Sequence, residues 1–220
     1  MKTIIASGDI KYVKSMACFF VMLGALALLL KGVQVKKPTF DLVIGQAGLL
    51  GVLLLISLGR LNELLEDCQK INKTAPVFIL AGFLLSWAFQ WYRETARQYG
   101  IAIAPGTSQV NVPDLGVITA DTVIIVISII LLGPLLEEML FRFIGLGLVR
   151  QLAKPGQAVF LIGAWVVATS TIFALLHGPE PAAFAIYFIS GVVYSIVYLR
   201  YGVLASLLVH AAGNAGVLII

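Results

Sequence analysis

Residues 122–148 read TVIIVISIILLGPLLEEMLFRFIGLGL, an apolar stretch that carries Glu137, Glu138 and Arg142. About 17–25 mainly apolar residues suffice for a helix to cross the hydrocarbon core of a bilayer. Charged side chains within such a helix are costly and by default indicate a functional site. Pro134 removes one backbone hydrogen bond part-way along and predicts a kink there. The stretch therefore predicts a membrane-spanning helix with a functional site inside the bilayer.

The composition of the whole chain agrees with this reading. Of its 220 residues, 60% are hydrophobic and only 12% are charged, whereas soluble domains carry about 25% charged residues. This excludes an ordinary soluble protein and predicts a single all-α domain, a polytopic bundle of membrane helices. The net charge of +4 comes from scattered Lys and Arg without a basic cluster interleaved with aromatics, so we expect a lipid bilayer and no nucleic acid as partner.

Seven spans are predicted along the chain. They are residues 15–30, 42–58, 74–92, 122–148, 157–176, 182–198 and 203–220. The charged stretch 59–73 is expected to form an exposed helical connection, and the polar stretch 93–121 an irregular loop. We interpret the first span as retained rather than as a signal peptide, because charged Lys31 follows it directly. With seven spans, nine Lys and Arg residues lie on the N-terminal side and five on the other, which favours a cytoplasmic N-terminus.

Helical spacing separates the two glutamates. Glu138 and Arg142 lie four residues apart, about 40° from each other around the helix, which suits an intrahelical ion pair. Glu137 lies about 140° from Arg142 and points elsewhere. Glu137 is therefore a candidate general base that activates water. The alternative is that both glutamates are structural ion-pair partners.

Two further polar pairs lie in the apolar spans downstream. Phe173 and His177 are four residues apart near the end of the fifth predicted span, and His210 and Asn214 are four apart in the seventh. His210 and Asn214 could present two donors to one point, as an oxyanion site requires. The alternatives are a capping or interface role for His177 and an interhelical hydrogen bond for the second pair.

These residues resemble the three motifs of the CPBP family, the CAAX-processing and bacteriocin-processing intramembrane proteases, also called the Abi family. The motifs are Glu137-Glu138-x-x-x-Arg142, Phe173-x-x-x-His177 and His210-x-x-x-Asn214, in that order. The resemblance covers residues 117–220. It divides the domain into N-terminal helices, 1–115, and a catalytic core, 116–220, with the site on the fourth, fifth and seventh helices.

The resemblance implies a glutamate-dependent endopeptidase that needs no metal or other cofactor. Glu137 would activate water with help from His177, and His210 with Asn214 would stabilise the oxyanion. Glu138 and Arg142, with Phe173 as further support, would hold the geometry of the site. The implied substrate is a membrane-associated peptide or protein, possibly lipid-modified, cut in CAAX-type, leader or sorting-signal processing. The implied location is a prokaryotic cell membrane.

Depth in the membrane poses a problem for a shared site. His177 ends one span, whereas His210 lies about seven residues inside another, which separates them by roughly 20 Å along the membrane normal. A shared site requires either that the turn 178–181 is recessed into the bundle or that the sixth span is short and tilted. Hydrolysis also requires a water-filled cavity, which Glu180 could line.

Other functions remain open at this point. The sequence lacks the His-Glu-x-x-His motif, which argues against a metalloprotease. Cys18 and Cys68 show no disulfide or metal-ligand spacing. A proton-coupled transporter would use intramembrane acids and histidines, but no inverted repeat is visible. The main alternative is a non-catalytic membrane scaffold or bacteriocin-immunity protein of the same family.

Overall fold

The structure is a computed structural model that describes residues 39–57, 60–69, 71, 74–101, 119–154, 156–177 and 181–219. Within these ranges the chain forms helices and no strand, which confirms the predicted all-α class. The α-helices are α2 (Thr39–Ser57), α3 (Leu61–Gln69), α4 (Ala75–Gln98), α5 (Ala120–Ile127), α6 (Gly133–Glu137), α7 (Gly147–Leu152), α8 (Ala158–His177), α9 (Pro181–Tyr201) and α10 (Val203–Ile219). Two π-helical segments, η2 (Ser128–Leu132) and η3 (Glu138–Leu146), join α5 to α6 and α6 to α7.

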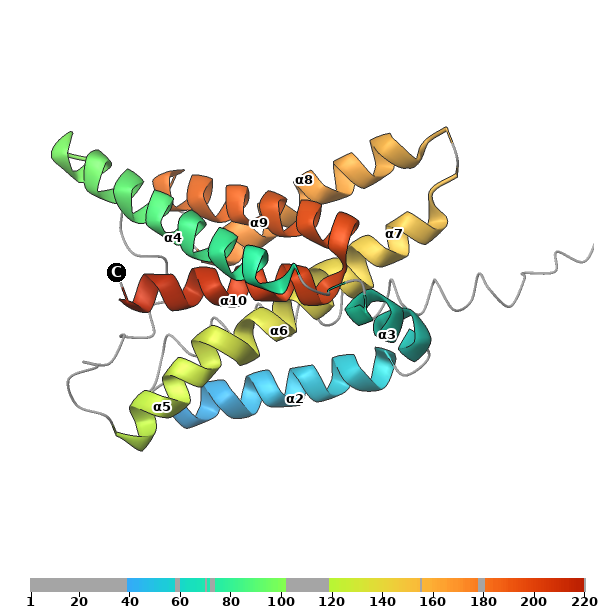
Figure 1. Cartoon of the computed structure of the whole chain (residues 1–220), viewed down its shortest axis with the longest axis horizontal. Coiled ribbons are helices and arrows are strands. Elements are labelled where there is room, and N and C mark those ends of the chain that lie inside the picture. The colour runs from blue at the N-terminus through green and yellow to red at the C-terminus, as the bar shows by residue number, and fades with distance from the viewer. Residues whose placement is uncertain are drawn as a thin grey trace, which may run out of the picture.

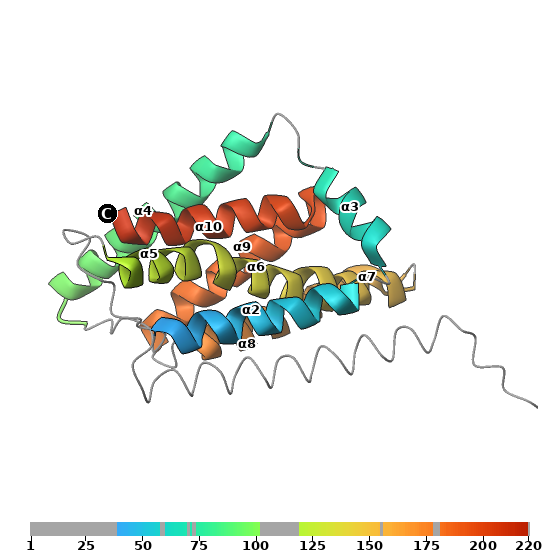
Figure 2. The same ribbon diagram turned by 90° about the horizontal axis from the view of Figure 1, so that it is seen from below.

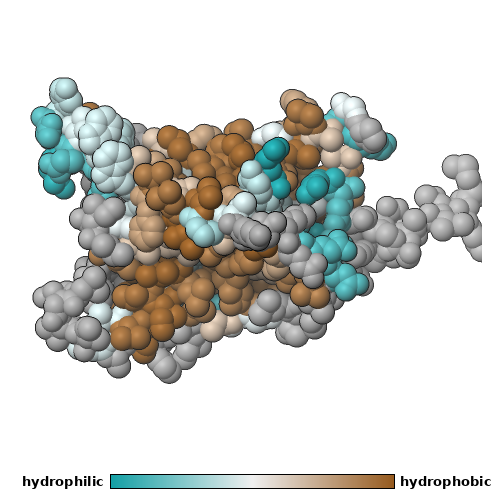
Figure 3. All heavy atoms as spheres, viewed as in Figure 1, coloured by the Kyte–Doolittle hydropathy of each residue, from teal (hydrophilic) through white to brown (hydrophobic). Residues whose placement is uncertain are grey.

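Four helices of the described chain are long and apolar enough to cross a membrane, by length and composition. They cover residues 75–98, 122–152, 158–177 and 183–201, and a shorter apolar helix covers 203–218. Hydrophobic residues form a band across the middle of the molecule, and hydrophilic residues gather at its two ends (Figure 3). The predicted span 15–30 lies outside the described residues, so the count of seven spans stays a prediction.

The central element is one uninterrupted helix from Ala120 to Leu152, built from α5, η2, α6, η3 and α7. Thr119 caps it: its hydroxyl accepts a hydrogen bond from the Thr122 N–H (3.1 Å), and the Thr122 hydroxyl accepts one from the Thr119 N–H (3.4 Å). The irregularity expected at Pro134 takes the form of a π-helical segment that ends at Leu132, two residues before the proline. Such π-helical turns are frequent at functional sites.

This central helix runs through the bundle, with α2 and α10 packed against it (Figures 1 and 2). Helix α10 also packs along α4 at very short range, because a Cβ atom on Gly82 would lie 2.4 Å from the Val209 carbonyl oxygen. A Cβ atom on Gly216 would likewise lie 2.7 Å from the Ser86 side chain. Glycines on both helices, Gly82 on α4 and Gly216 on α10, therefore permit this close approach.

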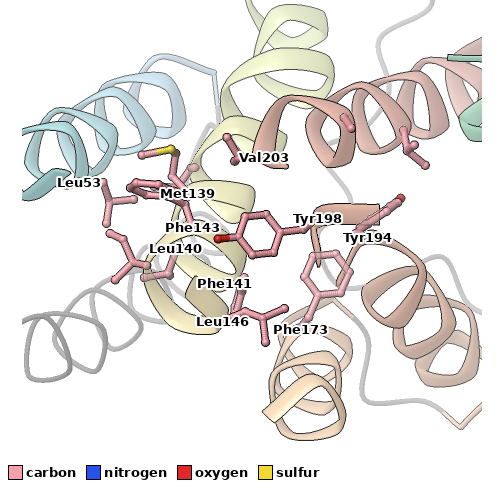
Figure 4. Packing of buried hydrophobic residues seen from close by; sticks show 14 of the residues in the cluster. Leu53, Met139, Leu140, Phe141, Phe143, Leu146, Phe173, Tyr194, Tyr198 and Val203 are labelled. Carbon is pink, nitrogen blue, oxygen red and sulfur yellow. The ribbon is translucent and has the colours of Figure 1, made fainter. Parts of the chain in front are cut away.

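Large side chains of the central helix fill the core. Phe141, Phe143 and Leu146 are almost completely buried, and Phe173 and Tyr198 contribute rings from α8 and α9 (Figure 4). The core thus brings together the helices that carry the three sequence motifs.

Two predictions about the connecting segments were wrong, one about exposure and one about a boundary. The connection 59–73 is helical at α3, but it is not fully exposed, since Arg60 and Asp67 are each only 8% exposed. The Arg60 guanidinium lies 4.6 Å from the centre of the Phe143 ring, a cation–π contact that explains its burial. The predicted loop 93–121 starts too early in the sequence, because α4 continues through Gln98. An ion pair joins Glu94 and Arg97 on the last turns of this helix.

A single residue, Gly202, joins α9 to α10. Its φ of +86° is accessible to glycine and strained for other residues. A side chain there would also collide with α3, because a Cβ atom would lie 2.4 Å from the Asp67 carbonyl oxygen. Gly202 therefore fixes where α10 begins and, with it, the position of the residues that α10 carries.

Candidate active site

The two adjacent glutamates lie at the junction of α6 and η3 and are both buried, Glu137 with 8% and Glu138 with 0% of its surface exposed. Because they are consecutive on a helix, their side chains leave it in different directions. Their surroundings therefore differ, and so do the roles that they can take.

Glu138 is the acceptor at the centre of a buried polar network. Arg142 Nη1 donates to its Oε1 at 3.0 Å, which confirms the ion pair predicted from the four-residue spacing. His210 Nδ1 lies 2.9 Å from the same oxygen. The Ser206 hydroxyl lies between Glu138 Oε2 and the Tyr194 carbonyl oxygen and can donate its one hydrogen to either.

Arg142 ties this network to the neighbouring helices. Its Nη2 donates to the Gly191 carbonyl oxygen at 3.0 Å, and its guanidinium lies 5.3 Å and 5.4 Å from the ring centres of Phe173 and Tyr194. Glu138 and Arg142 are thus bound by protein groups, an arrangement that suits a structural role.

Glu137 faces the two histidines. His177 Nε2 lies 3.4 Å from its Oε1, and His210 Nε2 lies 3.6 Å from its Oε2. These three side chains come from α6, α8 and α10, so helices distant in the sequence converge on one carboxylate. A carboxylate between two imidazole nitrogens can take up and pass on a proton.

In each ring, Nδ1, the nitrogen that does not face Glu137, has a hydrogen-bond partner that sets the orientation of the ring. His177 Nδ1 lies 2.8 Å from the Phe173 carbonyl oxygen, which can only accept, so this nitrogen carries the hydrogen. The Phe173 carbonyl thus directs His177 Nε2 toward Glu137. Glu138 does the same for His210, because it engages that ring's Nδ1.

Aromatic rings surround the two imidazoles. The Phe173 ring lies 4.3 Å from that of His177 and 5.8 Å from that of His210. On α9, Tyr187 lies 4.8 Å from the His177 ring, and Tyr194 stacks on His210 at 4.4 Å. The Phe173 and Tyr194 rings, both labelled in Figure 4, lie 6.3 Å apart in an edge-to-face arrangement. Both tyrosines were missed from the sequence, although their seven-residue spacing places them on one helix face.

The expected depth mismatch between the histidines is wrong. His177 lies level with Tyr187 and His210 level with Tyr194, and these tyrosines are separated by only about 10 Å along α9. Side chains cover that distance, with the Glu137 carboxylate reaching both rings. Helix α9 is 21 residues long, so the sixth span is not short. The turn 178–180, including Glu180, lies outside the described residues.

Asn214 contacts a different part of the central helix. Its Nδ2 donates to the Ile129 carbonyl oxygen at 2.9 Å, two turns before Glu137. Its predicted role as an oxyanion donor stays a prediction. Ser206, His210 and Asn214 recur every four residues on α10, and this polar stripe was the signal by which Ser206 could have been found.

Of the two cysteines, Cys68 lies on α3 and is partly buried, whereas Cys18 lies outside the described residues. Burial, together with the neighbouring Asp67 carboxylate, raises the pKa of the Cys68 thiol. An unreactive thiol, as the sequence indicates, is consistent with this environment.

Comparison with known proteins identifies part of the chain. Residues 119–216 match a family model described as type II CAAX prenyl endopeptidase Rce1-like. No curated protein and no solved structure matches the chain. The matched range starts at the helix cap Thr119 and includes all three motifs, with both histidines that face Glu137. Its apolar helices are those of an integral membrane protein. Residues 119–216, just under half of the chain, are thus similar to the Rce1-like family of CAAX proteases, the protease family that the three motifs resemble.

Proposed function

We propose that this protein is an intramembrane glutamic endopeptidase in which Glu137 activates a water molecule. The observation that carries the proposal is the position of Glu137 between the Nε2 atoms of His177 and His210, at 3.4 Å and 3.6 Å. Glu138, by contrast, already accepts from Arg142, which leaves Glu137 as the acid available for chemistry.

Hydrolysis would then proceed as follows. Glu137 takes a proton from the water molecule while the water oxygen attacks the carbonyl carbon of the peptide bond. The carbonyl oxygen becomes an oxyanion, and when the tetrahedral intermediate collapses the bond to nitrogen breaks. The proton held by Glu137 passes to the leaving nitrogen, so that one water molecule is consumed and an acid and an amine are released.

The two histidines would serve different steps. His177 would hydrogen-bond, through Nε2, the water molecule that Glu137 activates. The Phe173 carbonyl fixes the orientation of the His177 ring. His210, when protonated at Nε2, donates to the oxyanion, while Glu138 balances its charge from the Nδ1 side. Asn214 as a second oxyanion donor is the alternative to a structural role of its amide, and it would use the amide hydrogen that does not engage Ile129.

The substrate that we propose is a membrane-associated peptide. The description of the matching family names prenylated CAAX substrates, in which a Cys near the C-terminus carries the lipid; leader or sorting-signal peptides are the alternative. We also propose that the end of the bundle with α3 and the end of α7 faces the cytoplasm of a prokaryotic cell. Arg60 and Arg150 belong to this end, where Gln151 on α7 donates to Glu63 on α3 at 2.6 Å.

The experiment is to compare wild type and Glu137→Gln in lipid nanodiscs. The probe is a quenched fluorescent peptide that ends in a farnesylated Cys-aliphatic-aliphatic-X sequence. Glu137→Gln preserves size but removes the base, so cleavage should fall by roughly 10²- to 10⁴-fold. Glu137→Asp keeps the carboxylate and should retain part of the activity. Glu94→Gln, at an exposed glutamate of α4, is the control for loss of one negative charge.

Two results would contradict the proposal. One is cleavage by Glu137→Gln at the wild-type rate, which would remove Glu137 from the chemistry. The other is a cellular phenotype that persists in Glu137→Gln, which would favour a scaffold or immunity function over hydrolysis.

A further inference from the structure

We propose that Asn214 and Arg60 are positioning residues, each of which supplies a hydrogen-bond donor to a carbonyl in a π-helical segment of the central helix. Their effect on catalysis rests on the proposed function. Their effect on the helix rests on the backbone geometry alone.

The first carbonyl is that of Ile129 in η2. In an α-helix its donor would be the N–H of residue 133, but the Gly133 N–H donates to Ser128, five residues back. If the five-residue pattern continued, the donor would be residue 134, and this is Pro134, which has no N–H. Neither pattern therefore supplies a backbone donor, and Asn214 Nδ2 occupies the position at 2.9 Å.

The second carbonyl is that of Phe143 in η3. Its α-helical donor would be the N–H of Gly147, which donates to the Arg142 and Ile144 carbonyls. Arg60 Nη1 donates to the Phe143 oxygen instead, at 3.2 Å, in a fully buried contact. The same guanidinium covers the Phe143 ring and is held by Glu63 through Nε at 2.7 Å.

These two contacts bracket the glutamates. Ile129 lies eight residues before Glu137 and Phe143 six residues after it. A carbonyl without a partner inside a membrane protein cannot turn to water, so its loss of a donor destabilises the local backbone conformation. We infer that the two side chains hold the π-helical turns and thereby the direction in which Glu137 leaves the helix.

This account of Asn214 differs from an oxyanion role in a measurable way. If Asn214 compensates for Pro134, then Pro134→Ala should make Asn214 dispensable, because the alanine restores a backbone N–H near Ile129. If Asn214 contacts the substrate, the effect of its loss should not depend on residue 134. A double-mutant cycle of Pro134→Ala and Asn214→Ala separates the two.

The cycle is read out by hydrogen exchange in nanodiscs and by kcat and KM on the farnesylated peptide. In the wild-type background, Asn214→Ala should lower the protection of amides 130–138 by about 5- to 150-fold, the effect of one unsatisfied buried carbonyl. In the Pro134→Ala background the same change should lower protection by less than about twofold, within the additivity error of independent sites. kcat should follow the same pattern while KM stays constant, since Glu137 is displaced and substrate contacts are not.

For Arg60, the test compares substitutions that remove or keep the donor. Arg60→Met keeps the apolar stem but loses the donor, so protection of amides 144–149 and kcat should both fall. Arg60→Lys keeps a donor and should restore part of each, because an ammonium group cannot replace the planar guanidinium on the Phe143 ring. Arg97→Met, at an exposed arginine of α4, is the matched control.

Equal effects of Asn214→Ala on exchange in the two backgrounds would overturn the role of Asn214, and unchanged exchange in Arg60→Met would overturn that of Arg60. A wild-type protein that does not cleave the peptide would refute the proposed activity on that substrate. The exchange cycle would still decide the inference, because it requires no catalysis.

Discussion

Removal of the Arg142 guanidinium should be among the most destabilising single changes in the described chain. In Arg142→Met the apolar stem remains, but Glu138, which is 0% exposed, loses the arginine that donates to it at 3.0 Å. Loss of one partner of a buried ion pair costs about 3–5 kcal/mol because the other charge stays buried. Loss of the cation–π contacts with Phe173 and Tyr194 adds about 1 kcal/mol.

These magnitudes sum to about 4–6 kcal/mol, which for a chain of this size lowers Tm by roughly 10–20 °C. The assay is thermal unfolding in detergent, followed by tryptophan fluorescence. The double variant Glu138→Gln, Arg142→Met should be more stable than Arg142→Met, since no uncompensated charge is left. The control is Arg97→Met, which breaks an exposed ion pair with Glu94 and should change stability by less than about 1 kcal/mol. Equal Tm values for Arg142→Met and Arg97→Met would refute this reasoning.

Three other expectations concern packing, reactivity and metal dependence. Gly82→Ala should destabilise the protein by about 1–3 kcal/mol, because its Cβ would lie 2.4 Å from the Val209 carbonyl, while Gly48→Ala, with nothing within 4 Å, should not. In a Cys18→Ser background, Cys68 should react with iodoacetamide more slowly than free cysteine at pH 8, since its raised pKa lowers the thiolate fraction; a faster reaction would contradict the described burial. Cleavage of the farnesylated peptide should persist after treatment with EDTA or 1,10-phenanthroline, and inhibition reversed by zinc would indicate a metalloprotease.

The features that could be predicted from the sequence are those set by local spacing. The ion pair of Glu138 with Arg142 follows from four residues of separation on one helix, and the structure has it. The all-α class follows from the apolar stretches, and the boundaries of α8 and α10 differ from the predicted spans by a residue or so. The divergent directions of the two glutamates follow from the same helical periodicity.

The meeting of Glu137 with both histidines could not be derived from spacing, and the resemblance to a family supplied that expectation. The estimate of depth failed because it treated helices as parallel rods and ignored side-chain length. Helix α9 crosses the bundle obliquely (Figure 2), and the side chains of His177 and His210 reach toward a common point. Distances along the membrane normal therefore overstated the separation of the reactive groups.

The role of Arg60 could not be predicted either. Its contact with the Phe143 carbonyl joins residues 83 positions apart, and the acceptor lies in η3, which departs from α-helical hydrogen bonding. A search for periodicity assumes a regular helix, so it cannot show which carbonyl oxygens of a π-helical segment accept hydrogen bonds from side chains. From the sequence, Arg60 was therefore indistinguishable from the other charged residues of the connection 59–73.

The close packing of α4 against α10 has a consequence for any attempt to produce a shortened form of this protein. The region that matches the family starts at residue 119. Three residues that contact this region precede it: Gly82 and Ser86, which pack against α10, and Arg60, which donates to the Phe143 carbonyl. A fragment cut at that boundary would contain every reactive group but would lack the surface that aligns them. Helix α4 and Arg60, which lie outside the matched range, thus contact the helices that carry the motifs.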